Sequence, residues 1–405
     1  MSKSARVSPS GLMRRSGTLL EEIGSGAVLE VEISDEHATG LHDMRLVTGV
    51  PCSWSIYCTS LMTQAGISIE RFAGTADEWD DFGRRQAGWT AFHRLAWRTV
   101  VSGTYGLDCP YLCARGAGGE LRGILPLVRL KSAAFGHYLV SMPYVNYGGP
   151  LGDDAAIVAL ADAADTMAAT GRVRMLELRS ARELPIDLPV SHRKITVVLP
   201  LDGGAEAVFG RFKAKLRSQV RRPAKEGVEI RMGADQVDAF HEVFARHMRD
   251  LGTPAQPLAF FRAIAREFGD DAWFACAWFE GRPIAAGAGF RWEGEFEITW
   301  ASALREYSRT SANMGLYWAL IERAANEGLR RFNFGRCTPE SPTHIFKRQW
   351  GAVDEPLWWY AGRGMAEART PSPDSAKFRL AVRVWQRLPL AITNALGSRI
   401  VRNIP

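Results

Sequence analysis

One sequence pattern occurs twice along the chain and restricts the folds that the chain can adopt. Residues 154–180 (DAAIVALADAADTMAATGRVRMLELRS) are typical of a long helix, a glycine and a short strand that ends near an arginine. Residues 312–336 (ANMGLYWALIERAANEGLRRFNFGR) repeat this order, and the interval between the two glycines equals the interval between the two arginines. A glycine after a helix is common by itself, but an ordered match of helix, glycine, strand and arginine indicates an internal duplication.

Strand patterns precede both helices. Residues 120–130 (ELRGILPLVRL) and 280–292 (EGRPIAAGAGFRW) each follow a turn, and residues 111–132 are typical of a hairpin with a glycine-rich turn. The sequence therefore predicts an α/β (α+β, mixed-sheet) fold with two tandem domains of one kind.

We expect four regions along the chain. Residues 1–65 are rich in Ser, Gly, Thr and charge and predict a disordered or poorly ordered N-terminal extension. The two similar domains follow over 66–194 and 195–365, the second with the probable site. Residues 366–405 form a basic amphipathic tail.

Composition and charge narrow the class of protein. The 405 residues are 46% hydrophobic and 23% charged, which suits globular domains. Residues 211–231 carry eight bases and two acids, a surplus equal to the net charge of +6, so a local anion-binding surface is favoured. The six cysteines have no zinc spacing, and no apolar run reaches the roughly 18 residues that cross a bilayer. We expect a reduced, cytoplasmic protein without a metal site.

Several segments resemble the FemAB-like family. They are KLRSQVRRPAKEGVEI, HMRDLGTP, the block ending in FNFGRCT, and IFKRQWGA, together with GILPLVRLKSAAFGHYLVSMPYVNYGGPL in the first half. The resemblance covers residues 67–365 and is strongest to the FemAB-type proteins that accompany exosortase and PEP-CTERM systems. It implies two tandem GNAT-type acyltransferase domains and transfer of an acyl group to an amine. The better-known relatives extend the peptide of a peptidoglycan precursor from aminoacyl-tRNA.

The resemblance implies a substrate site in the second domain. Phe346 and Lys347 match a Phe-Lys pair of that family, so Lys347 is the candidate catalytic residue, which would bind an anionic group or stabilise an oxyanion. The alternative is a surface lysine whose stem covers apolar area. Arg336 at the end of a strand is a candidate for holding an anion, but its counterpart Arg179 leaves a structural role open, such as a buried ion pair.

A basic helix is predicted early in the second domain. Its apolar positions recur at spacings of three and four, at Phe209, Phe212, Leu216 and Val220. Lys213, Arg217 and Arg221 form a cationic stripe on another face, which suits a phosphate chain or a nucleic-acid backbone. The alternative is a solvated helix face. Pro223 should bend or end this helix.

A third candidate region precedes the second long helix. In GNAT enzymes a glycine-containing turn there cradles the pyrophosphate of acyl-CoA, and the matching turn in this chain is RTSANMG (309–315), with Ala312 and Met314 in place of glycines. This difference weakens the case for acyl-CoA. It leaves room for a polar acceptor site in which Tyr307, Asn313 and Tyr317 would form hydrogen bonds, with core packing as the alternative for Tyr317.

The resemblance therefore implies a FemAB-type transferase. It would move an aminoacyl or acyl group onto an amino group of a cell-envelope or exopolysaccharide precursor, with aminoacyl-tRNA or acyl-CoA as donor and no tightly bound cofactor. The partners implied are tRNA and a lipid-linked precursor. The tail predicts either peripheral contact with the inner face of the cytoplasmic membrane or docking on its own domain. The alternatives are an acyl-CoA-dependent N-acyltransferase and a non-catalytic binding protein of an exosortase or polysaccharide export system.

Overall fold

The computed structural model describes residues 4–5, 17–23, 27–33, 43–48, 62–64, 66–132, 136–365 and 376–404. The chain divides into two compact units, Met1–Cys58 and Thr59–Pro405. The first unit holds an antiparallel sheet with the order β1-β4-β3-β2. Its strands are β1 Ser4–Ala5, β2 Gly17–Ile23, β3 Ala27–Ile33 and β4 Asp43–Thr48. Much of residues 1–65 lies outside the described residues, so the expectation of a poorly ordered extension stays a prediction.

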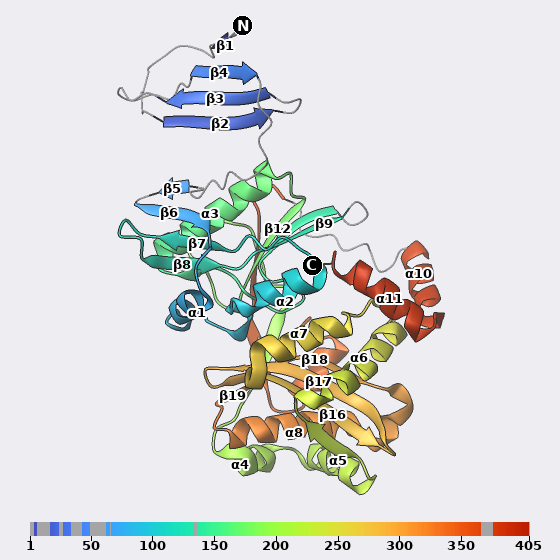
Figure 1. Ribbon diagram of the computed structural model, residues 1–405. Helices are drawn as coiled ribbons and strands as arrows, with labels where there is room; N and C mark the ends of the chain where they lie inside the picture. Colours follow the sequence, from blue (N-terminus) through green and yellow to red (C-terminus); the bar gives the residue numbers. More distant parts are fainter. Residues whose placement is uncertain are drawn as a thin grey trace. The chain divides into compact units, whose positions relative to one another are not determined.

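The second unit begins with a half that contains two sheets (Figure 1). Its strands are β5 Met62–Gln64, β6 Ile67–Arg71, β7 Leu112–Arg115, β8 Leu121–Leu125, β9 Val128–Ser132, β10 Gly136–Val140, β11 Leu151–Gly152, β12 Met175–Ser180 and β13 Val190–Ser191. Its helices are α1 Ala76–Arg84, the short 3-10 helix η1 Ala91–His93, α2 Ala96–Tyr105 and α3 Asp154–Thr170. The predicted hairpin is the antiparallel pair β7 and β8. One sheet has the order β11-β8-β7-β6-β5.

The following half is built on a single sheet of seven strands with the order β15-β16-β17-β18-β19-β14-β20. These strands are β14 Ile195–Pro200, β15 Glu229–Met232, β16 Ala272–Phe279, β17 Arg282–Trp292, β18 Glu295–Ala303, β19 Arg331–Cys337 and β20 Val353–Pro356. The helices are α4 Gly204–Arg211, α5 Ala214–Lys225, η2 Ala234–Gln236, α6 Val237–Leu251, α7 Leu258–Phe268, η3 Gly269–Asp271, η4 Arg305–Thr310, α8 Ala312–Asn326 and α9 Pro342–Arg348.

The two halves repeat one arrangement, as the duplicated sequence pattern predicts. In the first half β10 pairs in parallel with β12, the strand that follows the long helix α3. In the second half β18 pairs in parallel with β19, the strand that follows α8. The predicted α/β fold with mixed sheets is therefore confirmed. The helix ends differ in detail, because Gly328 is left-handed at φ +76°, whereas Gly171 is not and Arg172 takes that conformation in the first copy.

The two halves share strands and a core. The last strand of the second half, β21 Trp358–Ala361, lies in the first half's other sheet, which has the order β13-β21-β12-β10-β9. Helices α2 and α7 lie side by side between the halves (Figure 1). There the ring of Trp97 lies 5.2 Å from that of Phe268 and 5.3 Å from that of Phe290. Burying such large rings in one cluster is a major source of stability, so the junction between the halves is part of the core.

The predicted single basic helix is two helices. Helix α4 ends at Arg211 and α5 begins at Ala214, because Phe212 is extended (φ −70°, ψ 140°). This conformation directs the Phe212 ring into the core, where its centroid lies 5.5 Å from that of Trp350. Pro223 lies in the last turn of α5, which ends at Lys225, in agreement with the expected effect of proline.

The described part of the tail forms two helices, α10 Ala376–Arg387 and α11 Leu390–Val401, which pack beside α6 (Figure 1). Among the described residues, no helix is both long and apolar enough to cross a bilayer.

Candidate active site

The central feature of the second half is a fork between two parallel strands. Strands β18 and β19 pair only where Glu295–Glu297 faces Arg331–Asn333, after which the two strands separate. On its other edge β19 stays paired with β14. Beyond the pairing, therefore, β18 and β19 are no longer joined by backbone hydrogen bonds. We call this region the strand fork.

A β-bulge at Thr299 lies beside the strand fork. Ile298 pairs with Gly289 and Trp300 with Ala288, so Thr299 is the extra residue. The bulge changes which way β18 presents its side chains. Ile298 packs in the cluster around α8, whereas Trp300 packs with Phe260 and other residues of the opposite cluster. The Thr299 hydroxyl oxygen is buried and has no hydrogen-bond partner in the part of the chain that the structure describes.

Glu297 is a fully buried carboxyl group at the strand fork. The first half supplies both of its side-chain hydrogen bonds, since Asn146 donates to Oε1 and the Tyr147 hydroxyl donates to Oε2. Burial raises the pKa of Glu297 to about 8, and these two hydrogen bonds only partly oppose that rise. The carboxyl group therefore titrates near neutral pH, at the point where the two halves meet.

Lys347, from α9, contacts β19 at the strand fork and is only 4% exposed. Its Nζ donates to the carbonyl oxygens of Gly335 at 2.6 Å and Arg336 at 2.8 Å. Successive carbonyls of a regular strand point to opposite sides, but Gly335 has φ +69°, which lets both carbonyls face one ammonium. Burial lowers the pKa of Lys347 to about 8, with Glu297 and Cys337 opposing the decrease.

The two arginines that the duplication relates are in different environments. Arg179 is buried, forms an ion pair with Glu177 at 2.7 Å and donates to the carbonyl oxygen of Val145 at 3.2 Å. Arg336 has no carboxylate within ion-pair distance among the described residues, and burial, followed by the charge of Arg179, lowers its pKa to about 10. The two guanidinium groups lie 4.6 and 5.2 Å from the ring centroid of Trp359.

A second cation lies near Arg336. Lys194 donates from Nζ to the Thr338 hydroxyl at 2.7 Å, and burial and the charge of Arg336 lower its pKa. A cation whose pKa is lowered by a neighbouring cation is stabilised when an anion binds beside it. Arg179 therefore belongs to a buried ion pair, while anion binding by Arg336 stays a prediction.

Aromatic side chains lie beside Lys347. The ring of Phe346 lies 5.1 Å from that of Tyr317 and 6.4 Å from that of Trp350. Tyr317 is 6% exposed and also stacks on Phe334 at 5.6 Å. Burial raises the pKa of the Tyr317 phenol. Tyr317 is therefore mainly a packing residue, which was the alternative given for it, and its hydrogen bond to an acceptor stays a prediction.

Most backbone N–H groups of the turn before α8 donate hydrogen bonds within the turn itself. Ala312 N–H donates to the Thr310 hydroxyl at 3.2 Å, and Met314 N–H donates to the Ser311 carbonyl at 2.8 Å. Tyr307 and Asn313 flank this turn and are both half-buried. A diphosphate cradle needs several unengaged N–H groups at a helix N-terminus, so this turn is poorly suited to that role.

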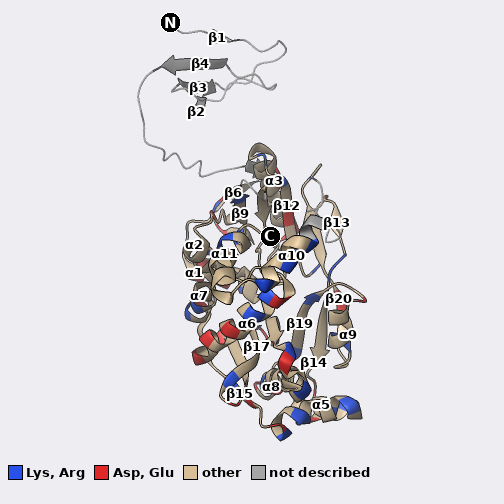
Figure 2. Cartoon of the chain, turned by 90° about the vertical axis from the view of Figure 1, so that its right-hand side faces the viewer, with Lys and Arg blue, Asp and Glu red and all other residues tan. Residues whose placement is uncertain are grey.

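The cationic stripe lies along a groove between α4, α5 and α8, and Figure 2 shows basic residues along α5. The groove has a volume of about 520 Å³ and is lined by Arg217 and Arg221 but also by Glu206 and Glu322. Arg221 stacks on Phe209 at 5.0 Å. Lys213 is exposed at the start of α5. The stripe is present, but the two acids reduce its net charge within the groove.

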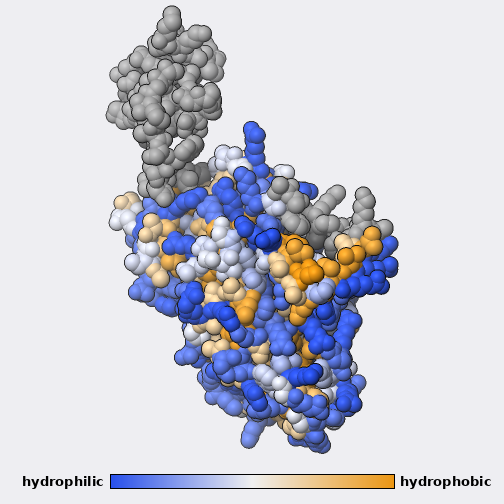
Figure 3. Space-filling model, turned by 45° about the vertical axis from the view of Figure 1, so that its right-hand side comes forward, coloured by the Kyte–Doolittle hydropathy of each residue, from blue (hydrophilic) through white to orange (hydrophobic). Residues whose placement is uncertain are grey.

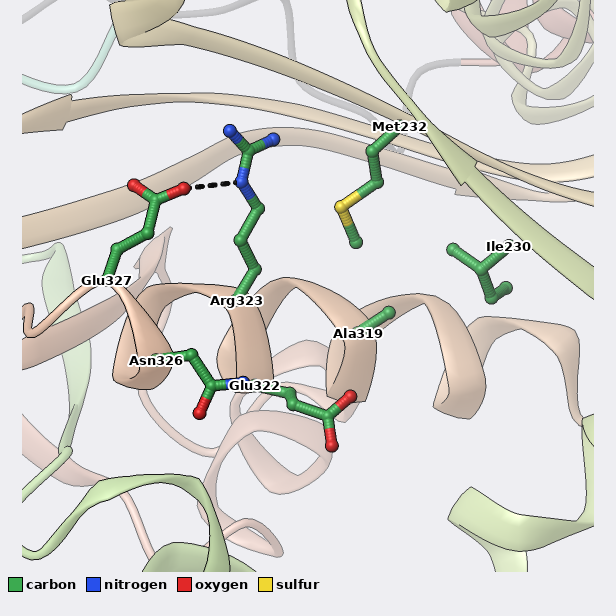
Figure 4. Close-up of a pocket in the computed structure, with 7 residues that line it drawn as sticks. All are labelled: Ile230, Met232, Ala319, Glu322, Arg323, Asn326 and Glu327. Atoms are coloured by element: carbon green, nitrogen blue, oxygen red, sulfur yellow. Dashed lines mark hydrogen bonds and ion pairs between the residues drawn. The ribbon is translucent and has the colours of Figure 1, made fainter.

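A second groove lies between α8 and β15 (Figure 4). It measures about 470 Å³, and Figure 4 shows Ile230 and Met232 facing the helix that carries Arg323 and Glu327. Arg323 donates to Glu327 at 2.8 Å. None of the predicted site residues lines this groove, so it adds nothing to the candidate site.

Sequence reasoning missed several residues at the strand fork. Glu297 was missed because Glu295 and Glu297 alternate with Phe296 and Ile298, a pattern typical of a strand with one solvent-facing side. The first half covers that side through Asn146 and Tyr147. Lys194 and Trp359 were also missed. One signal in the sequence could have distinguished the two arginines. Glu177 lies two residues before Arg179, whereas the matching position before Arg336 is Phe334.

Comparisons with known proteins support this assignment of the fold. Residues 210–348, which include the strand fork and Lys347, match the family model of the acetyltransferase (GNAT) domain. No curated protein sequence matches the chain.

Among solved structures, the chain is similar to FemX at 14% identity and a TM-score of 0.54, covering 71% of this chain and 96% of that one. It is also similar to L-PGS from Bacillus licheniformis, at 14% identity and a TM-score of 0.49, covering 78% and 98%. A tandem GNAT protein from the clavulanic acid biosynthesis pathway has 15% identity and a TM-score of 0.43, covering 74% and 100%. The domain match and the FemX comparison confirm the predicted tandem GNAT-like fold. The domain match supports an acyltransferase.

Proposed function

We propose that this chain is a FemAB-type transferase that moves an aminoacyl or acyl group onto an amino group of a cell-envelope or exopolysaccharide precursor. The observation that carries the proposal is the strand fork, since Lys347, Glu297 and the bulge at Thr299 all lie where β18 and β19 stop pairing. The resemblance of several segments to FemAB proteins of exosortase and PEP-CTERM systems supports a precursor that such a system uses.

Attack of an amine on the donor carbonyl forms a tetrahedral oxyanion. Its collapse leaves an amide and breaks the ester or thioester bond, so the tRNA 3′-hydroxyl or the CoA thiol departs with the proton that the amine gives up. An ammonium has three N–H donors, and Lys347 uses two on the carbonyls of Gly335 and Arg336. The third is available for the oxyanion or for an anionic group of a substrate. The bulge also leaves the backbone of Thr299 outside the regular ladder. Donors held in place before the reaction stabilise developing charge without reorganising.

The attacking amine must also lose a proton. Glu297 titrates at about 8 and is hydrogen-bonded to the Tyr147 hydroxyl. A general base works best when its pKa is near the operating pH. Glu297, acting through Tyr147, is therefore the candidate proton acceptor at the strand fork.

The acceptor is proposed to carry a phosphate or carboxylate. Arg336 has no carboxylate within ion-pair distance among the described residues. Lys194 lies close enough that, after burial, the charge of Arg336 lowers the pKa of Lys194. Arginine binds both kinds of anion through paired N–H groups. A lipid-linked precursor with a phosphate would provide the missing negative charge.

The donor is proposed to be aminoacyl-tRNA. The turn before α8 uses most of its N–H groups internally, while Lys213, Arg217 and Arg221 provide cations for a nucleic-acid backbone. The second candidate function is acyl-CoA-dependent N-acyl transfer, because the GNAT domain match favours it. Neither donor requires a tightly bound cofactor.

The test is incubation of the full chain with lipid-linked acceptors that carry a free amine, with aminoacyl-tRNA or acetyl-CoA in separate reactions, read by mass spectrometry. An acceptor that gains one aminoacyl mass from aminoacyl-tRNA supports the first proposal. A gain of one acetyl mass supports the second candidate. Unchanged acceptor masses with both donors would favour a non-catalytic binding protein.

A further inference from the structure

The two tail helices are held to the protein by only one face each. On α10, Val382 lies over Gly252, where a Cβ would come within 2.4 Å of the valine side chain, and Gln386 donates to the Asp250 carbonyl at 2.9 Å. On α11, Thr393, Gly397 and Val401 are buried, and Gly397 lies against Ala255. The inward faces of α10 and α11 therefore account for the packing of the tail on its own domain.

Each of the two helices exposes a pair of large apolar side chains on its outward face. On α10, Leu380 is 62% exposed and Val384 is 54% exposed. On α11, Ile392 is 44% exposed and Leu396 is 43% exposed. Within each pair the residues are four apart, so they lie on one side of their helix. Figure 3 shows apolar surface in this region next to hydrophilic surface. Soluble proteins seldom leave four such residues grouped without a partner.

The same segment is strongly basic. Residues 376–405 contain six Lys and Arg and no Asp or Glu, whereas the whole chain has a net charge of only +6. Arg383 and Arg387 are exposed on α10, one turn apart and next to the apolar pair, and Arg399 is exposed on α11. An apolar face bordered by cations matches the layered chemistry of an anionic bilayer surface, with acyl chains below and phosphates above.

We propose that the outward face of α10 and α11 is a docking surface for a bilayer that contains anionic lipids. A second copy of this chain is disfavoured as the occupant, because two such faces would bring the exposed Arg383, Arg387 and Arg399 of each copy together, and residues 376–405 contain no Asp or Glu. The tail helices are also attached to the first half, since the Tyr144 hydroxyl donates to the Arg402 carbonyl at 2.8 Å. The proposal does not depend on acyl transfer.

The test is co-sedimentation of the full chain with vesicles of phosphatidylcholine alone or mixed with phosphatidylglycerol. The wild type should bind the mixed vesicles, bind phosphatidylcholine at least tenfold more weakly, and dissociate at high salt. Arg383→Gln with Arg387→Gln should weaken binding about 30-fold, equivalent to about 2 kcal/mol for two charges near an anionic surface. Leu380→Glu with Val384→Glu should abolish it.

The matched control is Val190→Glu, which places the same acid at an apolar residue that is 44% exposed on β13. It should bind as the wild type does, and circular dichroism should be the same for all variants. Wild-type protein that remains in the supernatant with mixed vesicles overturns the proposal, as does wild-type binding by both double variants. A dimer that Leu380→Glu with Val384→Glu converts to a monomer, without vesicle binding, would assign the face to a second copy instead.

Discussion

Replacing Glu297 by Gln should change how the stability of this protein depends on pH. The substitution keeps the shape of the side chain and still offers an acceptor to Tyr147 or Asn146, but it removes the titrating proton. In the folded protein the pKa of Glu297 is about 8, against 4.5 for the ordinary glutamate. The effect arises from burial at the strand fork, so it tests whether the first half covers Glu297.

The sign follows from which state holds the proton. Below pH 4.5 both states are protonated, and the stabilising contribution is fully present. As the pH rises from 4.5 to about 8, the unfolded chain loses the proton first, so the free energy of unfolding decreases. At about 1.4 kcal/mol per pH unit, this interval gives an upper limit of about 5 kcal/mol.

The assay is urea unfolding of wild type and Glu297→Gln at pH 5 and pH 8, followed by tryptophan fluorescence and circular dichroism. Between these two values the wild type should lose several kcal/mol more than the variant. Glu280→Gln, in an exposed turn between β16 and β17, controls for the loss of one negative charge. Equal pH dependence in wild type and Glu297→Gln would refute the assignment of a buried, proton-holding carboxyl group at the strand fork.

Two further predictions concern the cations. Arg336→Gln should raise KM for an anionic acceptor roughly tenfold, the usual effect of losing one charge-assisted hydrogen bond, and should leave the melting temperature unchanged. Arg179→Gln should instead lower the free energy of unfolding by about 3 kcal/mol, because it leaves Glu177 unpaired. A destabilised Arg336→Gln together with a raised KM for Arg179→Gln would exchange the two roles. Combined Arg217→Gln and Arg221→Gln should reduce the salt dependence of tRNA binding in a filter assay by about two charges, and an unchanged slope would leave the stripe as a solvated helix face.

Much of the fold could be predicted because its signals are local. The patterns of 154–180 and 312–336 correspond to α3 with β12 and to α8 with β19. The break between α4 and α5 was not predicted, because Phe212 leaves the helix for a tertiary reason, its contact with Trp350. A regular spacing of apolar residues cannot show that one of them, here Phe212, packs against a residue far away in the sequence.

The site could be predicted only in part, since its chemistry is created where the halves meet. The resemblance pointed to Lys347 and Phe346, and the structure locates both beside the strand fork. Glu297 carries no signal of its own, because its burial depends on residues about 150 positions earlier in the chain. Arg336 could be distinguished from Arg179 only by the environment of each guanidinium group, to which Glu177 contributes.

The most direct test of the account is the transfer rate of Lys347→Met, measured as the mass gained by an amine-bearing acceptor from its acyl donor. Lys131→Met, at an exposed lysine on β9, is the matched control. The account predicts that Lys347→Met loses at least about 100-fold in rate, as expected when one oxyanion donor is removed, while the control keeps the wild-type rate and both retain the wild-type circular dichroism. A wild-type rate for Lys347→Met would contradict the central claim that the strand fork is the active site.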